Sequence, residues 1–357
     1  MWERAEHALV TPEDRAREWA AGAGLLVAHT RRPGSYAETD STLTAWEVAT
    51  GRCRWQQQVE SVPPRQPLAL DGDLLVAVHG PDRPQLRGYD AATGAARWSY
   101  RLTGEPRGAL VVDGDVVVVS GSTVHRVGRD GTPVASATVR GSALTTLALT
   151  DDGDLVVGNG RGRDHLLRLD AGTLEVRWAA TVPGERWLSS RPVLIDGGTA
   201  YLHAASAWAM AVDVATGEVR WKRRKAPGRD GALLPGPEGD PLWGTDFLAR
   251  IRARDGRPLW TVPDVVAAAA TPDRSRVVVA RAVDGGSRGL QEEPMDVRLE
   301  LLDATVGATL DALDLGAVER HWPAGGMSDR LFAVVDGALH SGLQPGRLRV
   351  IDLGLPG

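Results

Sequence analysis

Short runs of hydrophobic residues recur along the chain, and within each run the apolar positions are consecutive rather than alternating. Residues 116–119 are four valines, and residues 74–78 read Leu-Leu-Val-Ala-Val. A strand with one face in water alternates apolar and polar residues, so a continuous run predicts a strand that is buried on both faces. Comparable runs occupy residues 25–28, 155–157, 200–202, 277–280 and 331–335. The pattern predicts an all-β protein whose short second strands are covered from both sides.

Tight turns precede several of these runs. Residues 71–73, 113–115 and 152–154 each read Asp-Gly-Asp, and Asp-Gly is the strongest short-range signal for a hairpin. Clustered carboxylates can also bind calcium. We favour turn formation, because these segments recur at the same hairpin and lack the other ligands of a calcium loop.

A longer motif follows each predicted hairpin. Residues 89–98 read YDAATGAARW, and residues 212–221 read VDVATGEVRW. Weaker copies lead to Trp55, Trp178 and Trp260, always eight residues after the Asp position. The Thr-Gly step predicts a turn in which glycine supplies a positive φ. Because a buried Trp removes much apolar area from water, we expect the motif Trp to act as a wedge between neighbouring repeats.

Copies of the motif recur along the whole chain. Two degenerate copies lose the Trp, with Ser136 and Asp311 in its place, and an eighth copy ends near Asp352. The positions equivalent to the Asp are residues 47, 90, 128, 170, 213, 252, 303 and 352, which are 38 to 51 residues apart. This period is typical of four-stranded propeller blades. It predicts one domain over residues 1–357 with eight blades, and seven blades is the alternative.

The repeat resembles the Ala-x-Asp-x-x-Thr-Gly-x-x-x-Trp unit of the PQQ-like (quinoprotein-type) propeller family, which also forms the propeller of the bacterial outer-membrane assembly lipoprotein. The resemblance implies a closed β-propeller of four-stranded antiparallel blades. Quinoprotein dehydrogenases of this fold hold PQQ, calcium and commonly a disulfide of adjacent cysteines. This chain has a single cysteine, Cys53. We therefore expect no dehydrogenase cofactor site, no other cofactor and no metal.

The last blade lacks an outer strand of its own in the predicted pattern. Trp2 lies 23 residues before Leu25, close to the spacing between other motif Trp residues and the following run. We therefore expect residues 2–6 to complete the C-terminal blade and remove an open edge.

Charge and composition limit the kinds of partner that the protein is expected to bind. The formal net charge is −5 and the isoelectric point is about 5.9, which disfavours nucleic acid. The N-terminus has no apolar leader segment and no long apolar run follows, so a cytoplasmic monomer without a membrane contact is expected. The arginine-rich composition suggests GC-rich, bacterial coding. We interpret the basic run 222–225 as a solvated loop between blades, with a local anion contact as the alternative.

Three histidines, His29, His79 and His203, lie where second strands are predicted to end. Such positions ring one mouth of a propeller, which we call the top face. Histidine titrates near neutrality, so these residues are the candidates for an acid–base or ligand role. Hydrogen bonding to neighbouring loops is the favoured alternative, and a zinc site formed by the three is a weaker one.

Other side chains are predicted to contact a ligand or partner at the same face. The longest insertions there are residues 30–41 and 282–296, beside the Gly-rich residues 335–347, and clustered insertions are typical of functional loops. The candidates are Arg31, Tyr36, Asn159, His165, Trp187, Trp208, Asp246, Arg281, Arg288, Glu292, His321, Trp322 and His340.

These features favour a scaffold that binds a protein or peptide partner, or a small molecule, through its top face. The alternative is a cofactor-independent enzyme, such as a hydrolase, lyase or cyclase of bacterial specialised metabolism, that uses His and Asp/Glu. A sensor domain separated from a larger receptor is the third interpretation.

Overall fold

The described chain is built almost entirely from strands. The computed structural model describes residues 4–8, 15–31, 41–48, 50, 52–59, 68–80, 84–139, 144–160, 166–181, 193–204, 208–224, 232–244, 247–283, 295–318, 332–335, 338–344 and 347–352. Within these residues the strands form eight four-stranded sheets. One 3-10 turn, Pro237–Gly239, interrupts them, and no helix of this part is long and apolar enough to span a membrane.

We number the sheets in chain order. Sheet 1 contains β2 (Arg15–Gly22), β3 (Leu25–Arg31), β4 (Ser41–Glu47) and β5 (Cys53–Val59). Sheet 2 contains β6 (Leu68–Asp71), β7 (Leu74–His79), β8 (Gln85–Asp90) and β9 (Ala96–Arg101). Sheet 3 contains β10 (Pro106–Val112), β11 (Asp115–Ser120), β12 (Thr123–Val127) and β13 (Pro133–Thr138). Sheet 4 contains β14 (Leu144–Leu149), β15 (Leu155–Asn159), β16 (Leu166–Leu169) and β17 (Val176–Ala180).

The second half of the chain repeats this order. Sheet 5 contains β18 (Leu194–Asp196), β19 (Thr199–Ala204), β20 (Trp208–Asp213) and β21 (Val219–Arg224). Sheet 6 contains β22 (Ala232–Leu234), β23 (Leu242–Gly244), β24 (Phe247–Ile251) and β25 (Pro258–Pro263). Sheet 7 contains β26 (Val265–Ala270), β27 (Arg276–Ala282), β28 (Met295–Asp303) and β29 (Thr309–Val318). Sheet 8 contains β30 (Phe332–Val335), β31 (Ala338–Gln344), β32 (Arg347–Asp352) and β1 (Arg4–Ala8).

The all-β class and the four-stranded antiparallel blades predicted from the repeats are confirmed. The N-terminal strand β1 pairs antiparallel with β32, from Arg4 opposite Ile351 to Ala8 opposite Arg347. It begins two residues later than the predicted segment 2–6.

One assignment within sheet 8 is wrong. Residues 331–335 were expected to be a second strand, but β30 is the first strand of its sheet and β31 is the second. His340, expected in a Gly-rich insertion, lies within β31 opposite Ala333 and Val350. The missed signal is Asp336-Gly337, the same hairpin step that joins first and second strands elsewhere.

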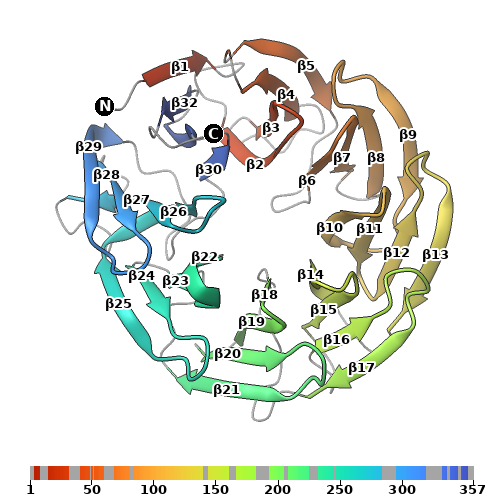
Figure 1. Cartoon of the computed structure of the whole chain (residues 1–357). Helices are drawn as coiled ribbons and strands as arrows, with labels where there is room; N and C mark the ends of the chain where they lie inside the picture. Colours follow the sequence, from red (N-terminus) through yellow and green to blue (C-terminus); the bar gives the residue numbers. More distant parts are fainter. Residues whose placement is uncertain are drawn as a thin grey trace. The chain divides into compact units, whose positions relative to one another are not determined.

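The chain divides into two compact units. One comprises Ala16–Ala200 and Asp213–Glu218, and the other comprises Met1–Arg15, Tyr201–Val212 and Val219–Gly357. In the first unit, the inner strands β6, β10 and β14 lie next to one another, and β5, β9, β13 and β17 run along the outside (Figure 1). In the second unit, β22, β26 and β30 are neighbours in the same way. The prediction of one domain over residues 1–357 stays a prediction.

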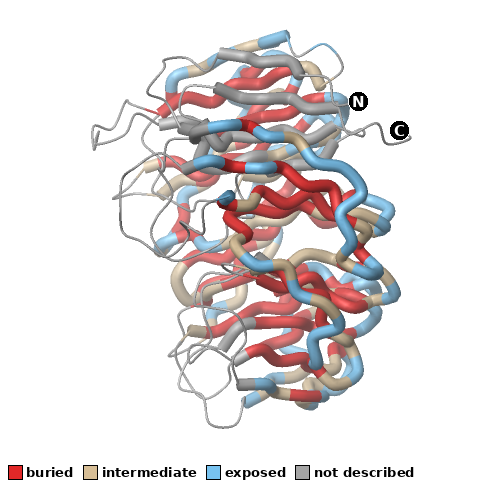
Figure 2. Tube along the Cα trace, turned by 90° about the vertical axis from the view of Figure 1, so that its left-hand side faces the viewer, coloured by how far each residue is buried: buried red, intermediate tan, exposed pale blue. Residues whose placement is uncertain are grey.

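Burial explains the sequence pattern. Every residue of β7 is buried, whereas exposed and half-buried residues alternate along β9. The same contrast holds between β15 and β17. Figure 2 shows buried and exposed segments side by side along the described chain. Second strands are therefore apolar without alternation because neighbouring sheets cover both of their faces.

The motif Trp residues lie between neighbouring sheets. Trp55 Nε1 donates to Ala91 O at 2.7 Å, and a Cβ at Gly94, whose φ is +75°, would lie 2.7 Å from the Trp55 ring. Only glycine fits this turn beneath the indole. The same hydrogen bond joins Trp98 to Arg129, Trp178 to Val214, Trp221 to Ala253 and Trp260 to Ala304.

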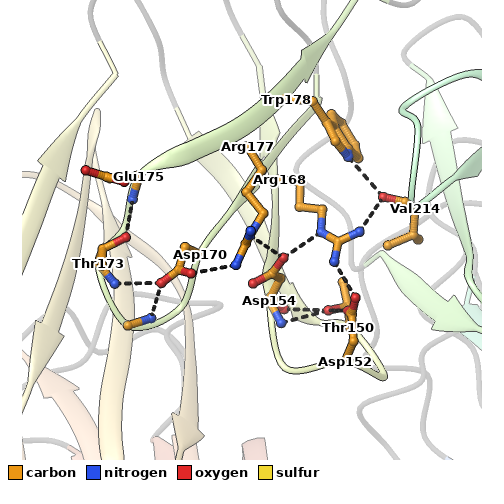
Figure 3. A network of polar contacts seen from close by, with 11 residues as sticks. Thr150, Asp152, Asp154, Arg168, Asp170, Thr173, Glu175, Arg177, Trp178 and Val214 are labelled. Atoms are coloured by element: carbon orange, nitrogen blue, oxygen red, sulfur yellow. Dashed lines mark hydrogen bonds and ion pairs between the residues drawn. The ribbon is translucent and has the colours of Figure 1, made fainter.

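Buried and half-buried arginines form a second link between sheets, which the repeat pattern did not reveal. In sheet 3, Ala135 and not the expected Ser136 lies in the Trp position, because Ala135 pairs with Arg126 as Trp178 pairs with Arg168. Arg126 Nη1 donates to Ala171 O of sheet 4 at 2.6 Å, and its Nε donates to Asp115. In sheet 4, Arg168 donates to Asp154, to Asp152 and to Val214 O (Figure 3). Arg250 repeats the arrangement in sheet 6 with Asp240 and Thr305 O. The carboxylates of the predicted turns thus bind guanidinium groups.

Candidate functional site

Sheets 1 and 2 share one hydrophobic core. The residues of this core identify the side of each sheet that faces the other sheet. Val27 of β3 and Ala77 of β7 belong to this core. Residues two apart on a strand point to the same side, so His29 continues the row of Val27 and His79 continues the row of Ala77. His29 is 4% exposed and His79 is 0% exposed. Two of the predicted histidines therefore lie on facing sides of neighbouring sheets, one step above their shared core.

Two further polar side chains of sheet 1 lie on the side of His29. Leu43, a core residue, pairs with His29 on one side and with Gln57 on the other, and Ser41 lies two residues from Leu43 on β4. Ser41 Oγ and Gln57 Oε1 are buried, and neither has a hydrogen-bond partner among the residues that the structure describes. Buried polar atoms are almost always paired, so each such atom indicates a site for a further hydrogen-bonding group.

Sheet 2 contributes a histidine–tyrosine pair. Tyr89 of β8 is a core residue, and its Oη lies 2.7 Å from His79 Nε2. The two rings meet edge to face, with centroids 5.7 Å apart. Arg87, two residues before Tyr89, lies on the same side and contacts Gln85 Oε1 at 3.4 Å. We call His29, Ser41, Gln57, His79, Arg87 and Tyr89 the polar layer.

The polar layer lies near the upper ends of sheets 1 and 2, where "upper" means the end that carries the connection between second and third strands. Water is largely excluded, so hydrogen bonds there are stronger than at the surface and an unpaired group costs more. The layer offers a hydroxyl and an amide oxygen without partners, beside two imidazoles and a phenol. This set can hold a neutral polar group, such as a peptide unit, by hydrogen bonds.

A second histidine–tyrosine pair joins sheets 2 and 3. Tyr100 Oη lies 3.2 Å from His125 Nδ1, and Thr103 Oγ1 lies 3.3 Å from His125 Nε2. Burial lowers the pKa of His125, which favours the neutral imidazole. The sequence analysis missed this residue. The alternation of His125 with the core residue Val127 was the available signal.

Arg281, a predicted contact residue at the end of the second strand of sheet 7, is held by Glu300 of its own sheet and by Pro263 at the end of β25 in sheet 6. Its Nη1 donates to Glu300 Oε1 and Oε2 at 3.0 and 3.2 Å, and its Nε donates to Pro263 O. Thr309 Oγ1 donates to the same carboxylate. Glu300 was not foreseen, because it is one of several charged residues in β28 and its partner lies 19 residues away.

The remaining predicted residues are placed only in part. Asn159 is buried at the end of β15. His203, Arg31, Trp208 and His340 lie on strands β19, β3, β20 and β31, and their side chains are outside the described set. The other predicted contacts also lie outside the described residues, namely Tyr36, His165, Trp187, Asp246, Arg288, Glu292, His321 and Trp322. Among described residues, no group of three or more His, Cys, Asp or Glu side chains is arranged to hold a metal ion.

The four-stranded blades, their Trp and Gly contacts and their repeat period define a β-propeller. A family model described as "Outer membrane protein assembly factor BamB" matches residues 39–132 and 121–234, which together span more than half of the chain. The chain therefore belongs to this PQQ-like β-propeller family.

Comparison with solved structures gives the same fold. The crystal structure of BamB from Moraxella catarrhalis is similar with a TM-score of 0.62 and 17% identity, over 99% of this chain and 98% of that one. At this identity the likeness concerns the fold alone. No curated protein matches the chain in sequence.

Proposed function

We propose that the protein is a scaffold that binds a protein or peptide partner at the upper ends of its sheets. In this proposal the eight sheets close into one ring, β1 completes the last blade, and the cytoplasmic monomer works as a single domain. The connections between strands at the upper ends supply the contacts, and the polar layer anchors them.

The observation that carries the proposal is the pair of unpartnered atoms in the polar layer. Ser41 Oγ and Gln57 Oε1 destabilise the free protein, since each is buried without a hydrogen bond. A peptide unit offers a donor and an acceptor that can satisfy both atoms. The family description supports a protein as the partner, because an assembly factor has to bind the proteins that it assembles.

Ser41→Ala separates this role from a structural one. If Ser41 waits for a partner, its removal leaves the free protein as stable as before, or more stable by up to about 1 kcal/mol, and weakens partner binding. If Ser41 only supports the fold, the substitution lowers the melting temperature. Ser136→Ala on the exposed outer strand β13 is the matched control.

The measurement uses wild type, Ser41→Ala and Ser136→Ala as parallel baits for affinity capture, followed by calorimetric titration of the purified captured protein. The proposal expects a protein that wild type and Ser136→Ala bind at one-to-one stoichiometry and that Ser41→Ala binds weakly. A captured set that does not differ among the three baits contradicts it.

The second candidate is a cofactor-independent enzyme. The hydrogen bond between Tyr89 Oη and His79 Nε2 favours it, because such a pair can pass a proton to a bound group. Turnover of a small molecule that is lost in His79→Gln but kept in Ser136→Ala would support this candidate over the scaffold.

A further inference from the structure

The outer strand β21 carries an unusual concentration of positive charge. It reads VRWKRR, with Arg220, Lys222, Arg223 and Arg224, whereas no other outer strand has more than two basic residues. The expectation that residues 222–225 form a loop is wrong for residues 222–224, which lie within the strand. Less and more exposed positions alternate around Trp221 as they do along the other outer strands. This alternation continues into the basic residues, and so does the strand.

The turn between β24 and β25 adds to this charge because it is fastened to β21. Trp221 Nε1 donates to Ala253 O at 2.6 Å, and Arg223 Nε donates to Asp255 O at 2.8 Å. The turn itself contains Arg252, Arg254 and Arg257. We call Arg223, Arg252, Arg254 and Arg257 the basic corner.

Carboxylates do not balance the basic corner. Asp255 is shared by Arg252 and Arg257, at 3.4 and 3.8 Å. In the part of the chain that the structure describes, no carboxylate pairs with Arg223 or with the exposed Arg254. Among the described residues, two of the four guanidinium groups therefore share one carboxylate and the other two pair with none, although the chain as a whole has a net charge of −5.

Comparable arginines in other sheets are neutralised. Arg97 lies between Asp73 and Asp90 at 2.7 and 2.6 Å, and Arg298 pairs with Asp314 at 2.6 Å. These two arginines have their counterions close by, and Arg223 and Arg254 of the basic corner differ from them in this respect. An excess of like charge raises the local potential and destabilises the free surface, unless an anionic partner compensates for it.

The backbone of β21 is also available. In its sheet β21 is hydrogen-bonded only to β20, so its other edge presents N–H and C=O groups. An extended peptide can add to such an edge, with main-chain hydrogen bonds supplying affinity and side chains supplying selectivity. Basic residues on an edge also discourage pairing with other strands. The other outer strands are edges too and lack this charge, so edge protection does not account for it.

We propose that β21 and the β24–β25 turn form a docking surface for an acidic, extended segment of another protein. The segment pairs with the edge of β21, and its carboxylates contact the basic corner. Nucleic acid is disfavoured as the occupant, because the net negative charge of the protein opposes its approach. This surface is separate from the polar layer and goes beyond the scaffold function proposed above.

The test uses a fluorescein-labelled peptide of alternating Glu and Val, long enough to span β21, and fluorescence anisotropy with the full chain. Binding is expected to weaken by roughly tenfold or more when Arg223, Arg254 and Arg257 are all replaced by Gln, and to weaken with added salt. Arg254→Gln alone, which removes no contact within the fold, should weaken it by a smaller factor. The same peptide with Lys in place of Glu, or with N-methylated backbone amides, should not bind.

A charge-matched control is Arg54→Gln, Arg107→Gln and Arg298→Gln combined, which removes three arginines that pair with carboxylates elsewhere. Equal losses in both triple variants would show a general charge effect and overturn the proposal. Absence of peptide binding to wild type, or tighter binding of a short DNA duplex or of anionic vesicles, would overturn it as well. Ser41→Ala should leave this peptide's affinity unchanged, so failure here is distinguishable from failure of the scaffold proposal.

Discussion

Tyr89 Oη and His79 Nε2 lie 2.7 Å apart in the interior of sheet 2, although ten residues separate them in the chain. Both side chains are buried, so the hydroxyl and the ring nitrogen satisfy each other where water does not reach. The pair also fixes the imidazole on the side that faces sheet 1. A histidine that the sequence marks as a site candidate is thus held by a tyrosine from the repeat motif.

Tyr89→Phe tests this relationship. The substitution keeps the ring but removes the partner of a buried nitrogen, so the free energy of unfolding should fall by about 1–3 kcal/mol. Chemical denaturation followed by Trp fluorescence measures it. Tyr100→Phe, which removes a longer contact at a half-buried site, should cost less, and equal costs would argue against a special role for the His79 pair.

Arg126→Met probes the arginine link of sheet 3, where no motif Trp accompanies it. Arg126 bridges Asp115 and Ala171 O. Its loss leaves a partly buried carboxylate and a carbonyl without this hydrogen-bond donor. Breaking a buried pair in this way should cost about 3 kcal/mol. Arg177→Met, at a half-exposed guanidinium, should cost about 1 kcal/mol or less. A cost at Arg126 no larger than at Arg177 would show that the intersheet link of Arg126 contributes little to stability.

Asp73 predicts a pH dependence. Hydrogen bonds from Arg129, then Arg97, lower the pKa of the Asp73 carboxyl from 3.8 to about 2. A carboxyl with a lowered pKa stabilises the fold above its unfolded-state pKa, and this stabilisation is lost as the pH falls from about 4 toward 2. The melting temperature of Asp73→Asn should therefore fall less steeply over this range than that of wild type. Superimposable pH profiles would contradict the assignment.

The motif Trp residues are expected to be structural, in contrast to those of the connections. Trp98→Ala or Trp221→Ala should cost about 3–5 kcal/mol, because each removes a large ring and an intersheet hydrogen bond. Trp187→Ala and Trp322→Ala, at positions predicted to lie in connections, should cost much less. Thermal unfolding of the four variants measures these costs. Equal losses of stability in all four would show that motif Trp residues and connection Trp residues do not differ in this role.

Deleting residues 1–8 removes β1 and exposes the edge of β32. The truncated protein should melt at a lower temperature or associate through the new edge. Calorimetry and size-exclusion chromatography with light scattering measure both effects. A truncated monomer with unchanged melting would show that β1 contributes little.

The fold was predictable because its signals are local. Asp-Gly hairpins, unbroken apolar runs and an Asp-to-Trp spacing of eight residues are readable within one repeat, and several blades reuse them. The exceptions arose where a local signal was overlooked. Asp336-Gly337 marks the first hairpin of sheet 8, so His340 belongs to a strand, and the period of β21 continues through Lys222.

The site was less predictable, because its contacts join distant segments. His29 and His79 could be placed at strand ends from the repeat, but their facing orientation depends on how two sheets pack. Arg126, Arg168 and Arg250 occupy one repeat position, yet their role becomes visible only when the carbonyl of the next sheet is in place. Charged residues on strands look alike in sequence whether they pair with a carboxylate, as Arg298 does, or lack one, as Arg254 does.

The pairing of β1 with β32 joins residues at opposite ends of the sequence, from Arg4 opposite Ile351 to Ala8 opposite Arg347. During synthesis, β1 leaves the ribosome long before β32 and stays without this partner until β32 has been made. Contacts of such long sequence separation form late and slow the final step of folding. Nascent chains of this protein should therefore carry an unpaired strand throughout translation, a period in which a chaperone, or the β1 of a second nascent chain, competes for sheet 8.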